Sequence, residues 1–525
     1  MIINLLKEKL NAVNVTSNDL FNLEITTDYS ITVYPRSINE LNKLIYFIGR
    51  EKHEKFLFIL SQSSEGEFSD FQGVVIPSVD STNGIQVKKC LLSHENAHQI
   101  QKRFQFTKPV LLGKSNSFGF GDRLGLANPA HIRSLELSDF RPIIAQQSIR
   151  ELTRTNRKPS DVMTAAVWAV FQEGYKDGFG SDADHLKTTD DIDLMINNGF
   201  TMFTFDPGDH VVNEADTYSI EELENYGDRI PWSSLRDTQD SMLERYEKTN
   251  VDLNDGFVIS PTREDVLRAM VKYGKAVAHI SSMYTHLEKN YAHLKYEIEI
   301  SVDETESVTT PFEHFFMASE LNRLGVKIIS LAPRFIGSFE KGIDYIGEIE
   351  IFKEEYLKHV KITEHFGSYK ISLHSGSDKF DVYAAIGSLK RGYTHVKTAG
   401  TSYLEAVKVI ATKNVPLFRE ILDFSRKLFV KEKATYHVSG DINKVHAASE
   451  YKDEELLALF ESNDARQVLH VTFGAVLTTK KENGEYLFRD KFMDCLEKNE
   501  ELHYKYLYNH FRRHLKPFEA SSKTN

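Results

Sequence analysis

Residues 370–380 read KISLHSGSDKF, and this stretch decides the fold prediction. A short run of apolar and β-branched residues, typical of a buried strand, ends in a histidine and is followed at once by small and charged residues. A strand interior favours another apolar side chain at position 374, and a turn needs the glycine and the aspartate but not an imidazole. His374 therefore indicates that a functional group is required at the end of this strand.

The same pattern recurs from about residue 107 to residue 430. Each strand-like run is followed by a polar turn and then by a segment with helical periodicity. Eight strands that alternate with helices are the number found in a closed (β/α)8 barrel of the TIM type, and an open doubly wound sheet is the alternative. The third run is unusually polar for a strand. The expected strands are residues 108–114, 141–148, 180–187, 201–207, 296–304, 326–334, 369–375 and 394–400.

Helix candidates lie between these strands at residues 160–175, 309–325 and 402–411. The second of them has the clearest boundaries. Pro311 stands at the first helical position, directly after Thr310, and Gly325 stands at the far end, where a glycine commonly terminates a helix.

Two regions flank the expected barrel. Residues 1–105 mix strand and helix patterns and are expected to form an N-terminal α+β cap. The barrel itself is expected over residues 106–430, with an insertion at about 207–290 that is capable of forming a lid and contains a long helix at about 261–289. Residues 431–525 are rich in Lys and Glu and are expected to be a helical C-terminal extension.

The bulk properties exclude several classes of protein. Of the 525 residues, 41% are hydrophobic and 27% charged, a balance typical of soluble globular chains. The net charge of −12, without a basic run, argues against nucleic acid or an anionic membrane as a partner. The two cysteines, Cys90 and Cys495, exclude a disulfide framework and fit a reducing compartment. With no signal peptide and no apolar run of about 18 residues, we expect a cytoplasmic protein, and its oligomeric state stays open.

Polar and ionisable side chains stand at nearly every expected strand end. Because the loops that follow barrel strands line one shared mouth, this pattern predicts a polar pocket there. The residues are Asp122, Gln146, Gln147, Asp184, His185, Lys187, Asp206, Asp303, Glu304, Arg334, His374, Asp378, Lys379, His395 and Lys397.

Histidines and carboxylates within this set have the composition of a divalent metal site. Imidazole and carboxylate ligands together suit zinc, manganese, cobalt, nickel or iron, whereas magnesium prefers oxygen alone. His185 and His374 are the main candidates, with Glu304 as a carboxylate ligand or an acid/base group. His395 is a weaker one, because strand alternation is expected to direct only one of His395 and Lys397 inward. A hydrogen-bonded structural role is the alternative for each histidine.

The cations at the strand ends suggest a second task. Arg334 can bind a carboxylate or a phosphate through two parallel hydrogen bonds. Lys187, Lys379 and Lys397 can add positive charge around a bound anion, act as a Schiff-base amine, or simply be solvated charges.

Two features of the backbone bear on the same pocket. The glycine-rich residues 117–129 lack the spacing of a phosphate loop and are expected to form a tight turn under the substrate. The helix starts after residues 374–380 and 397–402 can bind a phosphate or a carboxylate through backbone N–H groups. Asp182, Asp184 and His185 are so close in sequence that only some of them are expected to face the pocket.

Six separated motifs together resemble the tagaturonate/fructuronate epimerase family. They are SFGFGDRLGLANPAHIRSL, GSDADHLKT, SVDET, LAPRFIG, SLHSGSDKF and HVKTAGTSYLEA, in this order over residues 105–430. The resemblance implies a metal-dependent TIM-barrel isomerase that interconverts the acidic sugars D-fructuronate and D-tagaturonate. It also implies a metal at His185 and His374 and acid/base work by Asp184 and Glu304, and it leaves the third ligand open.

The implied chemistry is demanding, because the two sugars differ at a hydroxyl-bearing carbon two bonds from the ketone. Simple enolisation cannot invert that carbon. A retro-aldol cleavage followed by re-addition on the other face is one route, and a proton or hydride transfer is the other. Arg334 or Lys397 would then bind the uronate carboxylate. A metal-dependent sugar aldolase or isomerase and a non-catalytic carbohydrate sensor are the rival functions.

Overall fold

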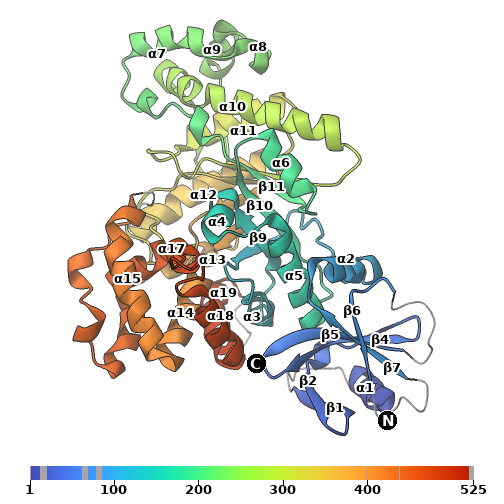
Figure 1. Ribbon diagram of the computed structural model, residues 1–525. Coiled ribbons are helices and arrows are strands. Elements are labelled where there is room, and N and C mark those ends of the chain that lie inside the picture. Colours follow the sequence, from blue (N-terminus) through green and yellow to red (C-terminus); the bar gives the residue numbers. More distant parts are fainter. Residues whose placement is uncertain are drawn as a thin grey trace, which may run out of the picture.

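The computed structural model describes residues 2–11, 20–61, 69–77, 85–398, 400–434, 436 and 438–519. At its centre eight parallel strands form a closed barrel in which the last strand pairs with the first, so the (β/α)8 prediction is confirmed (Figure 1). The barrel strands are β8 (Ser117–Gly121), β9 (Arg141–Ser148), β10 (Gly180–Leu186), β11 (Met202–Phe205), β14 (Glu297–Ser301), β15 (Ser330–Ala332), β16 (Lys370–Leu373) and β17 (Tyr393–Thr398).

The first barrel strand is not where the sequence predicted it. The expected strand at residues 108–114 is irregular, and the apolar side chain of Leu112 packs with Ile143 and Met202. The backbone N–H groups of Leu112 and Gly113 donate to the Glu297 carboxylate at the start of β14. These residues therefore close the amino-terminal end of the barrel, which explains their apolar character.

The true first strand, β8, lies in the glycine-rich stretch that was expected to be a turn. All five of its residues are buried. Gly119 has a packing reason, because a Cβ at this position would lie 2.1 Å from Gln146 Oε1 on the neighbouring strand. The small residue thus serves close strand packing rather than a turn.

Helices follow the strands around the outside of the barrel. The helix at Pro311–Arg323 begins as the sequence predicted, since the Thr310 hydroxyl accepts a hydrogen bond from Glu313 N and Pro311 occupies the first turn. The helices of the barrel are α3 (Asn128–Ser134), α4 (Ile149–Thr155), α5 (Pro159–Glu173), α6 (Thr189–Ile196), α10 (Arg263–Tyr291), α11 (Pro311–Arg323), α12 (Ile349–His365), α13 (Phe380–Leu389) and α14 (Thr401–Lys413).

The N-terminal region is an antiparallel sheet in the order β1-β2-β4-β5-β7-β6, with β3 beside β4. One face packs on α1, and side chains of the other face join the core that contains α5. Its elements are α1 (Ile2–Asn11), β1 (Phe21–Thr26), β2 (Tyr29–Val33), β3 (Asn39–Leu41), β4 (Leu44–Glu51), β5 (Glu54–Ser61), β6 (Gly73–Ile76), β7 (Gln86–Leu91) and α2 (His94–Arg103).

The insertion after β11 projects away from the N-terminal sheet and ends in the 29-residue helix α10 (Figure 1). Thr262 caps that helix by accepting a hydrogen bond from Asp265 N. Lys272 of α10 is buried between Asp216 of the insertion and Glu313 of α11. The shorter elements are α7 (Ile220–Tyr226), α8 (Trp232–Leu235), α9 (Gln239–Glu247), β12 (Val251–Asp252) and β13 (Val258–Ile259).

The described part of the C-terminal region is helical, as the sequence predicted. Most of its helices share one apolar core with α14, the last helix of the barrel, whereas Leu507 and Phe511 of the final helix join the barrel core. Among the described helices, none has the length and apolar character to cross a membrane. The helices are α15 (Val415–Lys433), α16 (Asn463–Val471), α17 (Phe473–Thr478), α18 (Arg489–Lys498) and α19 (Glu500–Leu515).

Candidate active site

Strand β10 directs three ionisable side chains into the barrel mouth, although the sequence suggested that only some of them could face it. Asp182 and Asp184 alternate normally along the strand. His185 joins them because the register with β11 shifts between Ala183 and Leu186 and because His185 adopts a left-handed φ of 56°. A positive φ is costly for a residue with a side chain and is common at functional sites. The bulge therefore turns the His185 imidazole towards the cavity.

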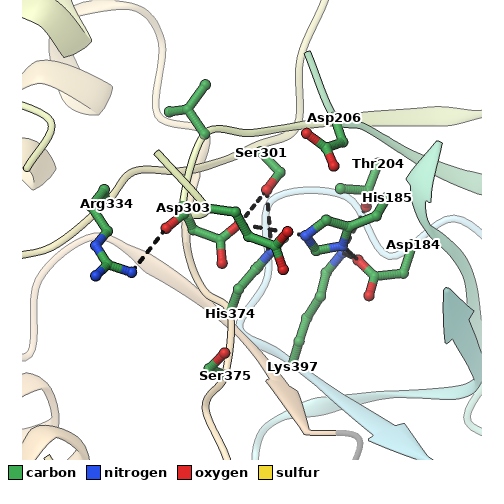
Figure 2. A network of polar contacts seen from close by, with 12 residues as sticks. Asp184, His185, Thr204, Asp206, Ser301, Asp303, Arg334, His374, Ser375 and Lys397 are labelled. Atoms are coloured by element: carbon green, nitrogen blue, oxygen red, sulfur yellow. Dashed lines mark hydrogen bonds and ion pairs between the residues drawn. The ribbon is translucent and has the colours of Figure 1, made fainter. Parts of the chain in front are cut away.

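His374, directly after β16, lies between two carboxylates at the barrel mouth. Its Nε2 lies 2.7 Å from Glu299 Oε1 and its Nδ1 lies 3.1 Å from Asp303 Oδ1. The centres of the His374 and His185 rings are 5.0 Å apart (Figure 2). Asp184, His185 and His374 each offer one ligand atom, and these atoms all lie within 4.8 Å of one another. Two histidines that are 189 positions apart in the sequence thus meet beside a carboxylate.

Asp303 is a central residue to which the sequence assigned no role. Its carboxylate accepts a hydrogen bond from Ser301 and lies close to both imidazoles, 3.1 Å from His374 Nδ1 and 3.5 Å from His185 Nε2. Glu299 and Ser301 are two residues apart on β14, so strand alternation directs both inward, and Asp303 follows in the next turn. The polar residues of EIEIS were therefore the signal that could have identified this face.

Lys397 donates to the Thr204 hydroxyl and contacts three buried carboxylates, at 2.7 to 2.8 Å. Burial opposes its charge, but these carboxylates raise the pKa of Lys397 well above its ordinary value. Its positive charge is therefore already matched inside the protein, which argues against the expected role as an anchor for the substrate carboxylate. The three carboxylates belong to Asp182, Asp184 and Glu299.

The expectation that only one of His395 and Lys397 faces inward was wrong, because residues two apart share a face of a strand. His395 Nδ1 lies 2.9 Å from the Ser117 hydroxyl, and the imidazole is fully buried. Burial lowers the pKa of His395 to about 3, so this ring is neutral. Within the described chain, His395 belongs to none of the side-chain groups that could hold a metal.

The charges around the two central histidines are strongly coupled. Burial lowers the pKa of His185, but Asp184 and Asp303 more than offset it and hold the pKa well above the usual value. The pKa of His374 is raised to about 9 in the same way, against burial and mainly by Asp303. Burial would raise the pKa of both aspartates, yet the neighbouring cations hold it well below the ordinary range. The site thus holds ionised carboxylates beside two protonated rings.

This donor set fits a divalent cation. His185 Nε2 is buried and 3.5 Å from the nearest carboxylate oxygen, that of Asp303, which is too far for a good hydrogen bond. Metal ligation requires neutral imidazoles, so an ion would take the place of the two ring protons among the same carboxylates. Mixed nitrogen and oxygen donors suit zinc, manganese, cobalt, nickel or iron.

Four other predicted site residues lie around the edge of this group. Glu304 is partly exposed and pairs with Arg150 at 2.8 Å, and its carboxylate forms a second candidate metal group with Asp206 and His185. Lys187 is 45% exposed and pairs with Asp209. Arg334 Nη1 donates to the Asp303 carbonyl oxygen at 3.3 Å, as Figure 2 shows.

Lys379 and Asp378 serve the loop after β16. The buried ammonium of Lys379 donates to three backbone carbonyls, those of Glu340, Ile343 and Ser377, and burial lowers its pKa to about 8. Asp378 pairs with Arg466 at 2.7 Å. Both side chains are occupied by protein groups, so they shape the loop rather than face the cavity.

Asp122 and Gln147 are likewise bound to protein groups. The Asp122 carboxylate accepts backbone N–H groups from four residues of the loop 124–128. Gln147 donates to Glu151 at 3.2 Å. Gln146, by contrast, lines the cavity.

The cavity beside the two histidines is walled by the barrel and by the C-terminal region together. None of its described lining residues comes from the insertion at 207–290. The residues are Arg123, Gln146, Ser148, Arg150, Glu151, Asp184, His185, Asp303, Lys341, His374, Ser375, Ser377, Lys397, Gly400, Tyr436 and His470.

Known proteins resemble this chain over almost its whole length. The tagaturonate epimerase family model matches residues 34–518. A tagaturonate/fructuronate epimerase of Thermotoga maritima is 41% identical over 493 residues, which cover 93% of this chain and 97% of that protein. Crystal structures of a fructuronate-tagaturonate epimerase from Cohnella laeviribosi, with one glycerol and in the native form, superimpose with TM-scores of 0.86 and 0.84. Both are 38% identical and cover 93% of this chain and 96% of theirs.

Proposed function

The chain belongs to the tagaturonate epimerase family, and we propose that it interconverts D-tagaturonate and D-fructuronate at the mouth of its barrel with the help of a divalent metal. One structural observation carries the proposal: Asp184, His185 and His374 bring their ligand atoms within 4.8 Å of one another beside a polar cavity. His185 and His374 would be the nitrogen ligands, and Asp184 or Asp303 would supply oxygen.

A bound divalent ion would polarise the ketone of the sugar and stabilise negative charge on its oxygen. The side chains of the protein must then accept one proton from the substrate and later return it. In a retro-aldol route the hydroxyl group of the carbon to be inverted gives its proton to a base. The bond to the carbon beside the ketone breaks, and its electron pair forms an enediolate. The resulting aldehyde turns over, the bond forms again on its other face, and the proton returns.

With Asp303 as the oxygen ligand, Asp184 and Glu304 are the proposed proton carriers. Asp184 contacts His185 Nδ1 at 2.8 Å, and Glu304 lies near the same histidine in the group that includes Asp206. Asp184 lies on β10 and Glu304 in the turn after β14, so the two carboxylates could approach a substrate beside His185 from different sides of the barrel mouth. Lys397 keeps Asp184 ionised by its contact at 2.8 Å and positions the carboxylate for proton transfer.

Glu299 is proposed to act through His374 as a positioning residue. Its carboxylate lies 2.7 Å from His374 Nε2 and is fully buried. A carboxylate behind a ligating histidine fixes the orientation of the ring and leaves the other nitrogen free for the metal. Here that other nitrogen is Nδ1, the one that faces Asp303.

The test is to incubate the purified protein with D-fructuronate and to follow D-tagaturonate by NMR, with elemental analysis of the same sample. We expect about one divalent ion per chain and loss of turnover after chelation, with recovery when the ion is returned. His374→Ala should lose the ion and reduce turnover by about 10³-fold or more. Full activity of His374→Ala would refute the ligand assignment. Three-carbon products without an epimer would indicate an aldolase, and a bound ion without any turnover would indicate a sensor.

A further inference from the structure

One wall of the cavity carries a buried ammonium group that has no ion-pair partner among the described residues. Lys341 lies in the loop between β15 and α12, and its ammonium donates to the Ser375 hydroxyl at 2.5 Å. Within the described chain, no carboxylate is within ion-pair distance of Lys341. Burial lowers the pKa of Lys341, and Arg150 adds to this, whereas Glu304, Asp303 and Glu151 favour the charge from beyond ion-pair distance. A hydroxyl does not balance a buried charge, so a bound anion would stabilise this ammonium.

Arg123 lines the same cavity from the loop after β8. Its Nε and Nη2 donate to Glu151, at 2.9 and 2.6 Å, and its guanidinium lies over the Phe473 ring at 3.6 Å. These two contacts fix the plane of the group. The remaining nitrogen, Nη1, is buried and has no partner among the described residues. Two buried N–H groups that are held rigidly and have no acceptor can donate hydrogen bonds to a bound anion.

His470 of α16 also lines this cavity. Its side chain is 1% exposed, yet neither ring nitrogen makes a hydrogen bond to the described protein. Two glycines leave room for the ring: a Cβ at Gly400 would lie 1.8 Å from His470 Cε1, and one at Gly342 would lie 3.0 Å from Nδ1. Gly400 also precedes the first turn of α14, where the backbone N–H groups have no side-chain cap. The imidazole is therefore accommodated in the cavity wall without a protein partner.

We propose that Lys341, Arg123 and His470 form the subsite for the carboxylate of the sugar acid. One carboxylate would balance the charge of Lys341 and accept N–H groups from Arg123 and His470, which are the groups left without acceptors. This inference rests on the proposed function for its substrate, and it assigns the selectivity for acidic sugars to residues other than Arg334 and Lys397.

The subsite also has a task within the retro-aldol route. The bond that breaks lies between the ketone and the carboxylate, so the carboxylate remains on the aldehyde fragment. A carboxylate held by Lys341 and Arg123 would keep that fragment in the cavity while its carbonyl group turns over. Loss of the subsite should therefore weaken binding and also release three-carbon fragments.

The first experiment measures binding without chemistry. D-gluconate, an acid that lacks the ketone, is titrated into the metal-loaded protein by calorimetry, with neutral D-glucitol as the matched probe. Lys341→Met should weaken D-gluconate binding by about 30-fold or more, while Lys341→Arg should stay within about threefold of the wild type. D-glucitol should bind all three proteins alike. Lys358→Met, on the outer helix α12, is the matched control and should leave both affinities unchanged.

The second experiment measures turnover of D-fructuronate by NMR. Lys341→Met should raise KM and increase the three-carbon products formed per epimerisation, with its metal content unchanged. His470→Phe, which keeps a ring but lacks N–H groups, gives an independent variant should Lys341→Met fold poorly, and it should also weaken D-gluconate binding. Equal D-gluconate affinity in the wild type and in these variants would overturn the subsite. Wild-type protein that binds D-gluconate through Lys341 but never epimerises D-fructuronate would leave the subsite intact and refute the proposed function.

Discussion

The insertion after β11 and the helical region after β17 are both additions to the same barrel, but only the second reaches the cavity. The insertion follows a strand on the functional side and was expected to be the segment able to form a lid. Yet the described residues that line the cavity include Tyr436 and His470 of the C-terminal region and none of the insertion. Proximity in sequence to a barrel strand therefore does not decide which addition takes part in the site.

The packing of the two regions explains the difference. The C-terminal helices share their apolar core with α14, and α14 begins directly after Gly400, which lies in the cavity wall. Phe473 of this region supports the guanidinium of Arg123 directly. The insertion is instead fixed to the outer helix α11 through Lys272. The region that shares a core with a helix starting at the mouth is the one that shapes the mouth.

Between the two added regions, the larger effect is expected where the C-terminal region meets the barrel, at Arg123. Arg123→Met leaves the buried Glu151 carboxylate without its cation, which should cost about 3 kcal/mol of folding free energy. The substrate carboxylate also loses a donor, so kcat/KM for D-fructuronate should fall by about 10²-fold. Denaturant unfolding and steady-state kinetics measure the two effects.

The double variant Arg123→Met with Glu151→Met separates these effects. Removing both charges should restore most of the lost stability, because no unpaired carboxylate remains. The kinetic defect should persist, because the donor is still missing. Recovery of activity together with stability would mean that Arg123 acts only through folding.

A pH dependence is expected where the C-terminal region packs on the barrel helix α14. Glu405 of α14 is buried 3.3 Å from His510 of α19. Burial is the main cause that raises its pKa from 4.5 to about 7. Asp378 adds to this rise, whereas Lys408 and Arg466 oppose it. Between pH 4.5 and about 7 the Glu405 carboxyl group is protonated in the folded protein but ionised in the unfolded chain. The stability from this group is therefore present below pH 4.5 and is lost as the pH rises through 7.

The matched variant is Glu405→Gln, which stays neutral at every pH. The wild type should match this variant near pH 4.5 and should be less stable than it by about 3 kcal/mol above pH 7. Denaturant unfolding of both proteins across this range gives the comparison. Parallel stability curves would show that the Glu405 carboxyl group titrates normally.

Much of the barrel was predictable because buried parallel strands are apolar runs that alternate with helices. The prediction failed at residues 108–114, where Leu112 is apolar because it closes the barrel end, and at β8, whose glycines suggested a turn. The local sequence pattern indicates only that a residue is buried. Burial alone does not distinguish a barrel strand from an irregular segment that closes the end of the barrel.

Part of the candidate site could be predicted in the same way. His185 and His374, which the structure brings together, interrupt the strand pattern at its end. The position of Asp303 beside both rings was missed, although Glu299 and Ser301 mark the inward face of the preceding strand by alternation. The bulge at His185 has no sequence signature. His470 could not be found at all, since it is one buried residue of an amphipathic helix and only the fold brings it to Gly400.

The smallest effect on function is expected from the insertion, at Lys272. This side chain is 1% exposed and pairs with Glu313, and Asp216 is more accessible on its other side. Lys272→Met should reduce stability by about 2 kcal/mol, less than a fully buried pair would, because water can reach Asp216. KM and kcat should stay within about twofold, since the described insertion lines no part of the cavity.

Lys275→Met, one turn along α10 where the ammonium donates to the Tyr226 hydroxyl, is the matched control and should change neither stability nor kinetics appreciably. A large rise in KM for Lys272→Met alone would show that the insertion closes over the substrate during turnover, and would remove the contrast between the two regions.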